Sequence, residues 1–332
     1  MGEHVSLCPY KRYLSARGLS TIETLRKRIL ALVPLPGVVQ LGVPGLAVTV
    51  RTEENATGCG FYEPSIGFVI SGSKTSVIGD EVFHYDAGAM ILTGMDVPSA
   101  YCAMRASAAD PFIGLHMRLD ASVLSELLVM LEPQLAEIDS RICEDDCLAF
   151  AVPKPDESVL FHLERLFNCA QDPIESKYMA PLISRELHMQ LLLGPAGRML
   201  REIFTKDTLS NRVGRAVSWL RENFEKPFDA DELADMVHMA PSTFHRHFKA
   251  VTQMSPLQYQ KRLRLTAAQR LMMTEGLDAA TAAYRVGYRS PAQFSRDYGK
   301  LFNESPKRHV RRLKAGDGAD AASAQATEAL EH

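Results

Sequence analysis

The chain has 332 residues, of which 46% are hydrophobic, 23% charged and 8% aromatic. This length accommodates about two ordinary domains, and the composition is that of a globular protein, which excludes collagen-like, disulfide-scaffold and wholly disordered chains. The longest apolar candidate, residues 69–92, is interrupted by Gly, Lys, Asp and Glu, so we expect no membrane-spanning segment. The N-terminus lacks the pattern of a secretion signal and the six cysteines are scattered, which predicts reduced thiols in a cytoplasmic protein.

The net charge of −3 conceals a separation of charge along the chain. Residues 206–314 hold 20 Lys and Arg against 11 Asp and Glu, whereas the remainder holds 17 against 29. Such a basic segment is typical of a polyanion binder, because cations that neutralise phosphates release condensed counterions. On charge alone, a solvated basic surface remains the alternative.

The N-terminal part of the chain predicts one helix followed by strands. A helix is expected over residues 19–34, where Ser20 and Glu23 have capping-box spacing. Residues 38–119 form short β-type runs separated by turn residues, and Gly79-Asp80 is a hairpin signal within them. Strands of this length and spacing predict an antiparallel barrel or sandwich.

After Asp120 the apolar spacing becomes helical. Helices are expected over 121–138, 157–169 and 178–204, the last interrupted near Gly194. The predicted division is an N-terminal arm and helix (1–36), a β domain (37–120), a helical dimerisation or linker region (121–204), a second domain (205–314) and a disordered tail (315–332).

From Asp229 onward the chain contains an internal repeat, at an offset of 49 residues that becomes 50 after one inserted residue. The matching pairs are Asp229 with Asp278, Ala234 with Ala283, Val237 with Val286, Pro241 with Pro291, Phe244 with Phe294, Arg246 with Arg296 and Phe248 with Tyr298. Two copies of one structural device are therefore predicted.

Each copy predicts a helix, a tight turn and a second helix. In the second helix of each copy, aromatic residues one turn apart are buried, and a polar row remains outside. Gly287 is expected to form the second turn, and Ser290 with Gln293 a capping box. Such polar rows fit a DNA major groove. The candidate base-reading residues are Ser242, Thr243, His245, Arg246, Lys249, Ala292, Gln293, Ser295 and Arg296.

Between the copies, residues 256–273 predict a single helix about 27 Å long. Reading helices held at its two ends would lie about one duplex turn apart, roughly 34 Å, in successive major grooves. Helical hairpins that only pack together are the alternative. The candidate phosphate contacts are Arg262, Arg264, Arg270, Lys300, Lys307, Arg308 and Arg311.

Residues 213–313 resemble the DNA-binding domain of the AraC/XylS family, through FHRHFKAVTQMSPLQYQKRLRLTAAQRLM and AAYRVGYRSPAQFSRDYGKLFNESP. The resemblance implies that residues of both second helices face DNA bases, namely Ser242, His245, Arg246, Ala292, Gln293 and Arg296. Gln253 and Asn303 replace glycines usual in the family, and His309 replaces a common Tyr. Asn tolerates a left-handed backbone better than Gln does, so we expect strain at Gln253.

The N-terminal region resembles, less closely, the AraC-type arm with a cupin-like β domain, through EPSIGFVISGSK and IGDEVFHYDAG. In that family the domain senses a small molecule or mediates dimerisation. The candidate effector contacts are His84, His116, Tyr62 and Phe68.

The β domain lacks the His-x-His pair of a metal cupin, since His84 stands between aromatic residues and has only His116 as a distant partner. Neither a metal nor another cofactor is predicted. Cys143 and Cys147 could form a metal or redox pair, but no second pair supports this, and idle thiols are favoured. A sensing thiol at Cys59 or Cys102 lacks a basic neighbour that would lower its pKa.

The sequence therefore predicts an α+β multidomain protein, with an N-terminal antiparallel β cupin-like barrel with helices and a C-terminal all-α double helix-turn-helix. The expected function is that of a transcriptional regulator, for example an activator, without catalytic residues. Its expected partners are double-stranded DNA, RNA polymerase, a small-molecule effector and a second copy. Leu182, Leu187, Leu191 and Leu192 are candidates for either the dimer surface or a buried core. A cupin-type enzyme fused to a DNA-binding module and an effector-independent architectural protein are the alternatives.

Overall fold

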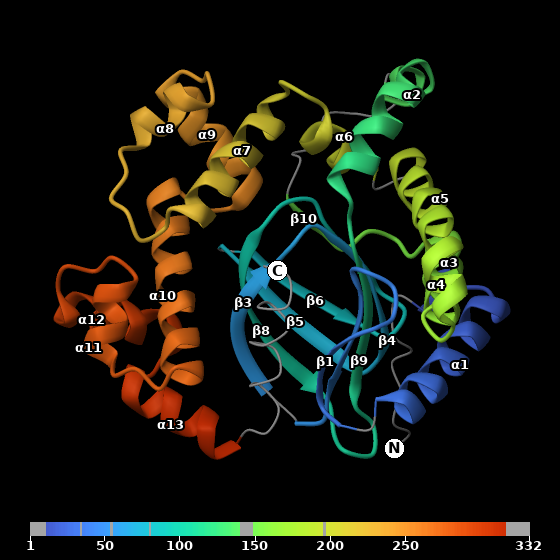
Figure 1. Ribbon diagram of the computed structural model, residues 1–332, viewed down its shortest axis with the longest axis horizontal. Coiled ribbons are helices and arrows are strands. Elements are labelled where there is room, and N and C mark those ends of the chain that lie inside the picture. The colour runs from blue at the N-terminus through green and yellow to red at the C-terminus, as the bar shows by residue number, and fades with distance from the viewer. Residues whose placement is uncertain are drawn as a thin grey trace, which may run out of the picture. The chain divides into compact units, whose positions relative to one another are not determined.

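The computed structural model describes residues 11–33, 35–53, 56–79, 81–139, 149–194 and 197–316 (Figure 1). The chain divides into two compact units, residues 1–211 and 212–332. Each unit has its own hydrophobic core and is described by itself.

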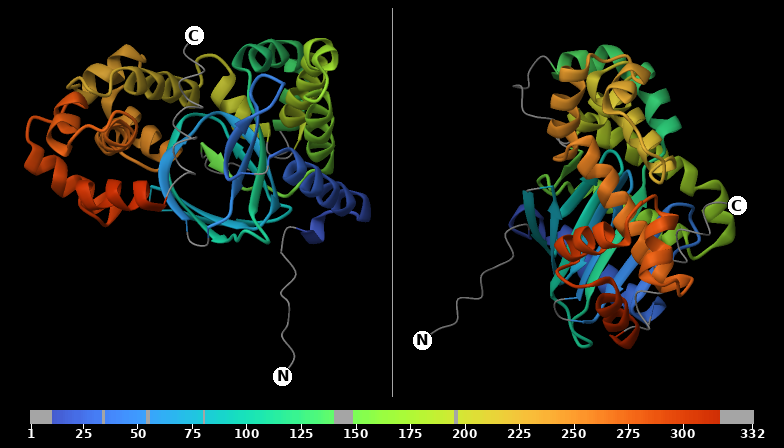
Figure 2. Two further views of the ribbon diagram at one scale, coloured as in Figure 1. Left: turned by 60° about the horizontal axis from the view of Figure 1, so that its bottom comes forward. Right: turned by 90° about the vertical axis from the view of Figure 1, so that its left-hand side faces the viewer.

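Two antiparallel sheets form the centre of the N-terminal unit and curve around a common interior (Figure 2). The larger has the order β1 (Gly37–Gln40), β2 (Leu46–Arg51), β9 (Phe112–Arg118), β4 (Ser65–Ser71), β7 (Met90–Thr93) and β10 (Phe150–Ala151). The smaller has the order β3 (Ala56–Tyr62), β8 (Val97–Arg105), β5 (Ser73–Ile78) and β6 (Glu81–Asp86). Ile78 pairs with Glu81, which confirms the predicted hairpin, and Gly79 has the left-handed backbone of its turn (φ 61°).

The larger sheet directs its two faces to different surroundings, because successive strand side chains alternate. Val48 and Phe68 both lie opposite Leu115 and are almost fully buried on one face. This face packs against the helices α1 (Ala16–Leu32) and α3 (Glu157–Cys169). The core of the unit thus lies between the sheet and these helices, and the other face is left for the interior between the sheets.

The first helix begins earlier than the sequence predicted. Its N-cap is Ser15, whose hydroxyl accepts a hydrogen bond from the backbone N–H of Gly18. The predicted start at residue 19 with a Ser20 cap is therefore wrong. The apolar spacing also predicts a buried stripe of Ile22, Leu25, Ile29 and Leu32; the first three are buried, whereas Leu32 is exposed.

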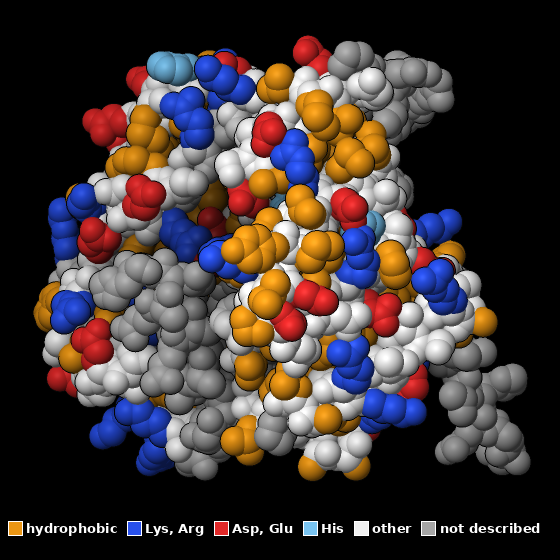
Figure 3. Space-filling model, turned by 45° about the vertical axis from the view of Figure 1, so that its right-hand side comes forward, with side chains coloured by type: hydrophobic (Ala, Val, Ile, Leu, Met, Phe, Trp, Pro, Cys, Tyr) orange, Lys and Arg blue, Asp and Glu red, His pale blue; other side chains and the backbone are white. Residues whose placement is uncertain are grey.

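The remaining helices of this unit are the 3-10 turn η1 (Lys11–Tyr13), α2 (Ala121–Asp139), α4 (Pro173–Tyr178), α5 (Ala180–Leu193) and α6 (Gly197–Phe204). Leu187, Leu191 and Leu192 are buried, so these three belong to the core rather than to a dimer surface. Exposed apolar side chains follow another line along α4 and α5, which we term the α4–α5 stripe: Ile174, Tyr178, Leu182, Met189 and Leu193. Figure 3 brings this side of the unit forward and shows apolar groups beside charged ones.

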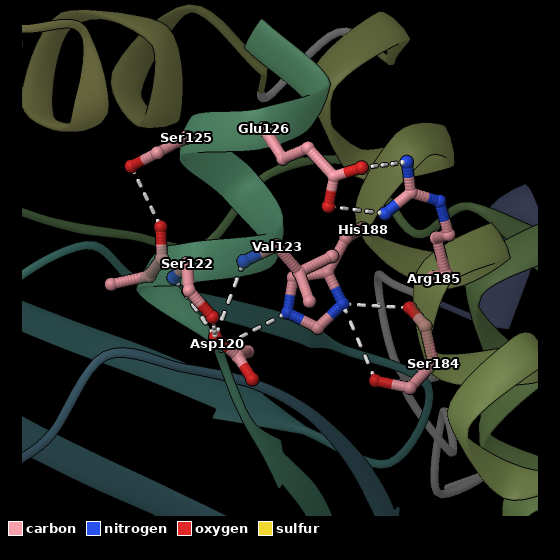
Figure 4. Close-up of polar contacts among 9 residues, drawn as sticks. Asp120, Ser122, Val123, Ser125, Glu126, Ser184, Arg185 and His188 are labelled. Carbon is pink, nitrogen blue, oxygen red and sulfur yellow. Dashed lines mark hydrogen bonds and ion pairs between the residues drawn. The ribbon is translucent and has the colours of Figure 1, made fainter.

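The chain leaves β9 for α2 through a hydrogen-bonded junction with α5 (Figure 4). The Asp120 carboxylate accepts from the backbone N–H groups of Ser122 and Val123, and its own N–H donates to Nε2 of His188 at 2.8 Å. Burial lowers the pKa of His188, which keeps the ring neutral and able to accept this bond. A bidentate pair between Arg185 and Glu126, with both distances 2.9 Å, holds the same two helices together.

The C-terminal unit consists of α7 (Leu209–Glu222), α8 (Ala230–Met236), α9 (Pro241–Thr252), α10 (Pro256–Thr274), α11 (Ala279–Arg285), α12 (Pro291–Phe302) and α13 (Pro306–Gly316). The repeat is confirmed as two helical pairs on either end of α10 (Figure 1). Phe248 of α9 contacts Tyr259 near the start of α10, with ring centroids 5.7 Å apart. Phe294 and Tyr298 of α12 pack with Ala268 and Met272 of its second half. No helix of the described chain is long and apolar enough to cross a bilayer.

Candidate functional site

Both helical pairs of the C-terminal unit turn through a residue with a left-handed backbone. His238 (φ 57°) and Gly287 (φ 85°) occupy equivalent positions of the repeat. After each, the next N–H bonds back to an alanine carbonyl of the preceding helix, from Met239 to Ala234 and from Tyr288 to Ala283. A side chain at Gly287 would place its Cβ 2.0 Å from the Glu225 carbonyl oxygen, so this turn requires glycine for space as well as for conformation.

The two reading helices, which we define as α9 and α12, present the predicted polar rows. Both begin with proline at their first turn. Thr243 is half-buried, and the other predicted side chains are exposed: Ser242, His245, Arg246, Lys249, Ala292, Gln293, Ser295 and Arg296. Phe244, Phe248, Phe294 and Tyr298 are fully buried on the opposite faces, so the rows face away from the core.

The two rows differ in how their arginines are held. Arg296 donates to Oε1 of Gln293 at 2.8 Å, and Nε2 of Gln293 donates to Asp297 at 3.0 Å. For Arg246 no hydrogen bond or ion pair is present within the described chain. The Ser290 hydroxyl accepts from the backbone N–H of Gln293, whereas the Gln293 side chain is directed to Asp297 and not back to the cap.

The rod between the readers is α10, whose 19 residues correspond to about 28 Å. Its N-terminus is fixed by the capping box of Ser255 and Gln258. Because α9 adjoins one end of α10 and α11 with α12 the other, we expect the reading helices to be separated by roughly the length of one duplex turn.

Most of the predicted phosphate contacts lie on the surface. Five are exposed, and Arg262 is half-buried: the exposed ones are Arg270, Lys300, Lys307, Arg308 and Arg311. Arg264 has another role, since its guanidinium donates to the carbonyls of Phe224, Glu225, Lys226 and Gly287. Burial lowers the pKa of Arg264. We therefore remove Arg264 from the phosphate contacts, because its donors bind the protein itself.

The two positions at which glycine is usual in the family have the left-handed backbone that glycine favours. Gln253 ends α9 at φ 61° and Asn303 ends α12 at φ 55°. The expected strained conformation at Gln253 is thus present. His309 is buried, hydrogen bonds the Tyr298 hydroxyl at 3.0 Å and has its pKa lowered to about 4 by burial.

In the N-terminal unit, polar side chains gather on the inner faces of the sheets. The hydroxyl of Tyr62 lies 2.7 Å from that of Ser76 and 3.0 Å from that of Tyr85. The Lys74 ammonium lies 5.0 Å from the centroid of the Tyr62 ring and 5.9 Å from that of Phe112, which belongs to the opposite sheet. We term Tyr62, Lys74, Ser76, Tyr85 and His116 the inner polar cluster.

Burial and the nearby charges set the protonation of the inner polar cluster. Burial, followed by Lys74, lowers the pKa of His116 to about 4, so the imidazole is neutral at pH 7. The pKa of Tyr62 is lowered, with Lys74 as the main cause that opposes burial, and burial raises that of Tyr85. The cluster therefore combines the Lys74 ammonium with a neutral imidazole and hydroxyl groups, and the Glu63 carboxylate is near enough to act on His116 as well. Such groups suit a ligand with several oxygen atoms.

The structure separates the four predicted effector contacts. Tyr62 and His116 lie in the inner polar cluster. His84 is exposed on the other face of the smaller sheet, where its Nδ1 meets the Thr75 hydroxyl at 2.9 Å, and Phe68 is buried beneath the helices. Lys74 and Phe150 were not predicted from the sequence, and the Phe150 ring stacks on that of Tyr62 with centroids 5.3 Å apart. Strand alternation places Lys74 on the same face as Ser76, but the sequence alone does not mark that face as the interior.

No group of three His, Cys, Asp or Glu side chains suited to a metal occurs among the described residues. Cys143 and Cys147 lie outside the described residues, and the side chains of Cys59 and Cys102 are likewise outside them.

Comparisons with known proteins give both halves of the chain a match. A family model described as AraC-type transcriptional regulator N-terminus matches residues 42–199, and one described as helix-turn-helix domain matches residues 233–312. The transcriptional activator RhaS of Escherichia coli O1:K1 is 31% identical over 154 residues, 45% of this chain and 54% of RhaS. The chain thus spans about half the length of the curated relatives it matches.

The whole fold resembles ToxT from Vibrio cholerae, with a TM-score of 0.54 at 11% identity, over 81% of this chain and 99% of that one. A β unit with covering helices, followed by a double helix-turn-helix unit, is the architecture of a two-domain helix-turn-helix protein. With its N-terminal and C-terminal matches in this order, the chain belongs to the AraC family of transcriptional regulators.

Proposed function

We propose that the chain is a sequence-specific DNA-binding regulator of transcription that binds a small-molecule effector and acts as a homodimer. The observation that carries the proposal is the pair of exposed polar rows on α9 and α12, held by one helix of about 28 Å. Because RhaS is named an activator, we extend activation and RNA polymerase as a partner to this chain.

The DNA-binding part of the proposal divides the exposed cations between two roles. The side chains on α9 and α12 read base edges, and Arg270, Lys300, Lys307, Arg308 and Arg311 contact phosphates. Arg262, which is half-buried on α10, remains in the phosphate set.

The proposal is tested by selection of DNA sites. The full chain is incubated with a duplex library that contains a random central segment, and bound duplexes are recovered and sequenced over several rounds. We expect enrichment of one motif with two elements about one helical turn apart. Enrichment that does not exceed bulk competitor duplex would overturn the DNA-reading function.

The Arg308→Ala variant tests the phosphate role. Arg308 is 74% exposed on α13, and its Nε lies 3.9 Å from the Glu304 carboxylate. We expect weaker binding to every duplex, with a slope of log affinity against log salt concentration reduced by about one unit. Titrations at four salt concentrations measure this slope, and an unchanged slope would remove Arg308 from the phosphate contacts.

The effector site of the proposal is the inner polar cluster. ToxT has been crystallised with a bound unsaturated fatty acid, but that likeness shows the fold alone. Here the Lys74 ammonium and the neighbouring hydroxyls favour a small ligand with a carboxylate or several oxygens. A panel of small carboxylates and their matched amides is tested for thermal stabilisation of the chain. Equal shifts with acids and amides, or none, would contradict this site.

The dimer part of the proposal rests on the α4–α5 stripe. Ile174, Tyr178 and Leu182 are 71%, 62% and 59% exposed, and Met189 continues the line two turns further along α5. An apolar surface patch can pair with the same patch of a second copy about a two-fold axis, so we commit to a second copy of the chain as its occupant.

The Leu182→Glu variant should convert the dimer to a monomer. The carboxylate would lie in an apolar interface without a partner, and the free energy needed to remove it from water opposes association. Sedimentation velocity measures the association state, and an unchanged far-ultraviolet circular dichroism spectrum shows that the fold is intact. Leu187 is buried and is not suitable for this test. A native chain that sediments as a monomer at micromolar concentration would refute the surface.

A further inference from the structure

Three side chains of the second reading helix, Asp297, Gln293 and Arg296, are joined by hydrogen bonds that the first helix lacks. We term this chain of hydrogen bonds the relay. Its origin is Asp297, which is only 6% exposed and lies on the inner side of α12. Its carboxylate accepts from the Lys261 ammonium of α10 at 3.3 Å, the Tyr288 hydroxyl at 3.3 Å and Nε2 of Gln293 at 3.0 Å. Burial, followed by the Asp297 carboxylate, raises the pKa of Tyr288, so that hydroxyl stays protonated and donates.

The relay fixes which way the Gln293 amide points. A carboxylate only accepts hydrogen bonds, so the amide must turn its nitrogen to Asp297 and its oxygen outward. That oxygen accepts from Arg296 at 2.8 Å. The Gln293 nitrogen is therefore turned inward and its oxygen is bound to Arg296, so the N–H donors that remain for a base belong to Arg296.

This arrangement decides between two bases that the side chains could read. Adenine is recognised by glutamine through both an acceptor and a donor, whereas guanine offers two acceptors, O6 and N7, to an arginine fork. With its nitrogen bound to Asp297 and its oxygen to Arg296, Gln293 does not present both groups to adenine, and Arg296 retains N–H groups that its bond to Gln293 does not use.

We propose that Asp297 is a positioning residue for sequence specificity, which, through Gln293, makes Arg296 a guanine reader and rejects adenine at that base pair. This inference rests on the proposed DNA-binding function. Asp297 itself touches no base, because it is buried on the inner side of the helix.

The first helix supplies the matched control. Offset by 50 residues, His247 of α9 stands where Asp297 stands in α12, and Thr243 where Gln293 stands. No relay to Arg246 exists there within the described chain. We therefore expect a strong base preference at one base pair read by α12 and a weaker preference at the equivalent base pair read by α9.

The test compares base preferences of the full chain and its variants. The native chain first selects its site from the random duplex library, and affinities are then measured for all four base pairs at each position. In Asp297→Asn, the new amide can donate to the Gln293 oxygen, so Gln293 turns over and releases Arg296. We expect the preference for guanine over adenine to fall at least tenfold at a single base pair, with binding to bulk duplex unchanged.

Two further variants keep the inference falsifiable. Gln293→Leu removes the relay from the exposed surface without disturbing the buried carboxylate, and should cause the same loss at the same base pair if Asp297→Asn fails to fold. His247→Asn should leave that base pair unaffected. A native site with no guanine opposite α12, or a Gln293→Leu variant that discriminates as sharply as the native chain, would overturn the relay. Failure of the native chain to select any motif would instead refute the proposed function.

Discussion

Replacement of Gly287 by alanine is expected to destabilise the C-terminal unit more than any other single methyl addition that we consider. The residue has φ 85°, a conformation that costs an L side chain about 1 kcal/mol or more, and the added Cβ would lie 2.0 Å from the Glu225 carbonyl oxygen. Relief of that overlap requires backbone movement, so the free energy of unfolding should fall by about 2–4 kcal/mol. Urea unfolding followed by the fluorescence of Trp219, the single tryptophan of the chain, measures this loss, because Trp219 and Gly287 both belong to the C-terminal unit.

His238 provides the control for this prediction because it occupies the equivalent turn of the first copy. His238→Gly relieves the left-handed strain of the side chain but increases the freedom of the unfolded chain, so the two effects should cancel within about 1 kcal/mol. If Gly287→Ala proved equally mild, the close approach of the second turn to Glu225 would not be a constraint on this fold.

Removal of either reading arginine should weaken binding to the selected site and leave binding to bulk duplex nearly intact. Arg246 and Arg296 are exposed at equivalent positions of α9 and α12, and neither is needed to hold the core. A lost arginine–base contact costs about 1–3 kcal/mol, or roughly 5- to 150-fold in affinity, and relaxes the preference at one base pair. Fluorescence-anisotropy titrations with the selected duplex and with single-base variants measure both effects.

The control for the arginine variants is Arg285→Ala. This arginine is also exposed, but it lies on α11 and pairs with Glu275 at 3.6 Å, outside the proposed DNA surface. Its loss should leave the affinity and the base preference unchanged. If Arg246→Ala weakened all duplexes alike, that side chain would be a phosphate contact and not a base reader.

The two helix-turn-helix copies could be predicted from the sequence, because the period of the repeat and the apolar faces of the helices are visible in the sequence itself. The aromatic pairs at Phe244 and Phe248 define one face of a helix without any knowledge of the fold. The side-chain partners were not predictable, since they depend on residues distant in the chain. The sequence predicts a phosphate contact at Arg264, whereas in the fold its guanidinium donates to the carbonyls of residues 224–226.

In the N-terminal unit, the strands could be recognised but not the direction of their side chains relative to the interior. Tyr62 and His84 were equal candidates in the sequence, and only the pairing of the strands places them on opposite faces. Lys74 carried no local signal of burial, because an isolated lysine in a strand is ordinarily at the surface.

The bonds of Arg264 connect the middle of α10 to the segment after α7 and to the turn at Gly287. Both reading helices pack against α10, so we expect them to be held at a fixed separation. Insertion of one base pair between the two target elements would rotate the farther one by about 34° around the duplex axis. Two reading helices at a fixed separation would not follow that rotation. The spacer between the two target elements should therefore be constant in length even where its sequence varies.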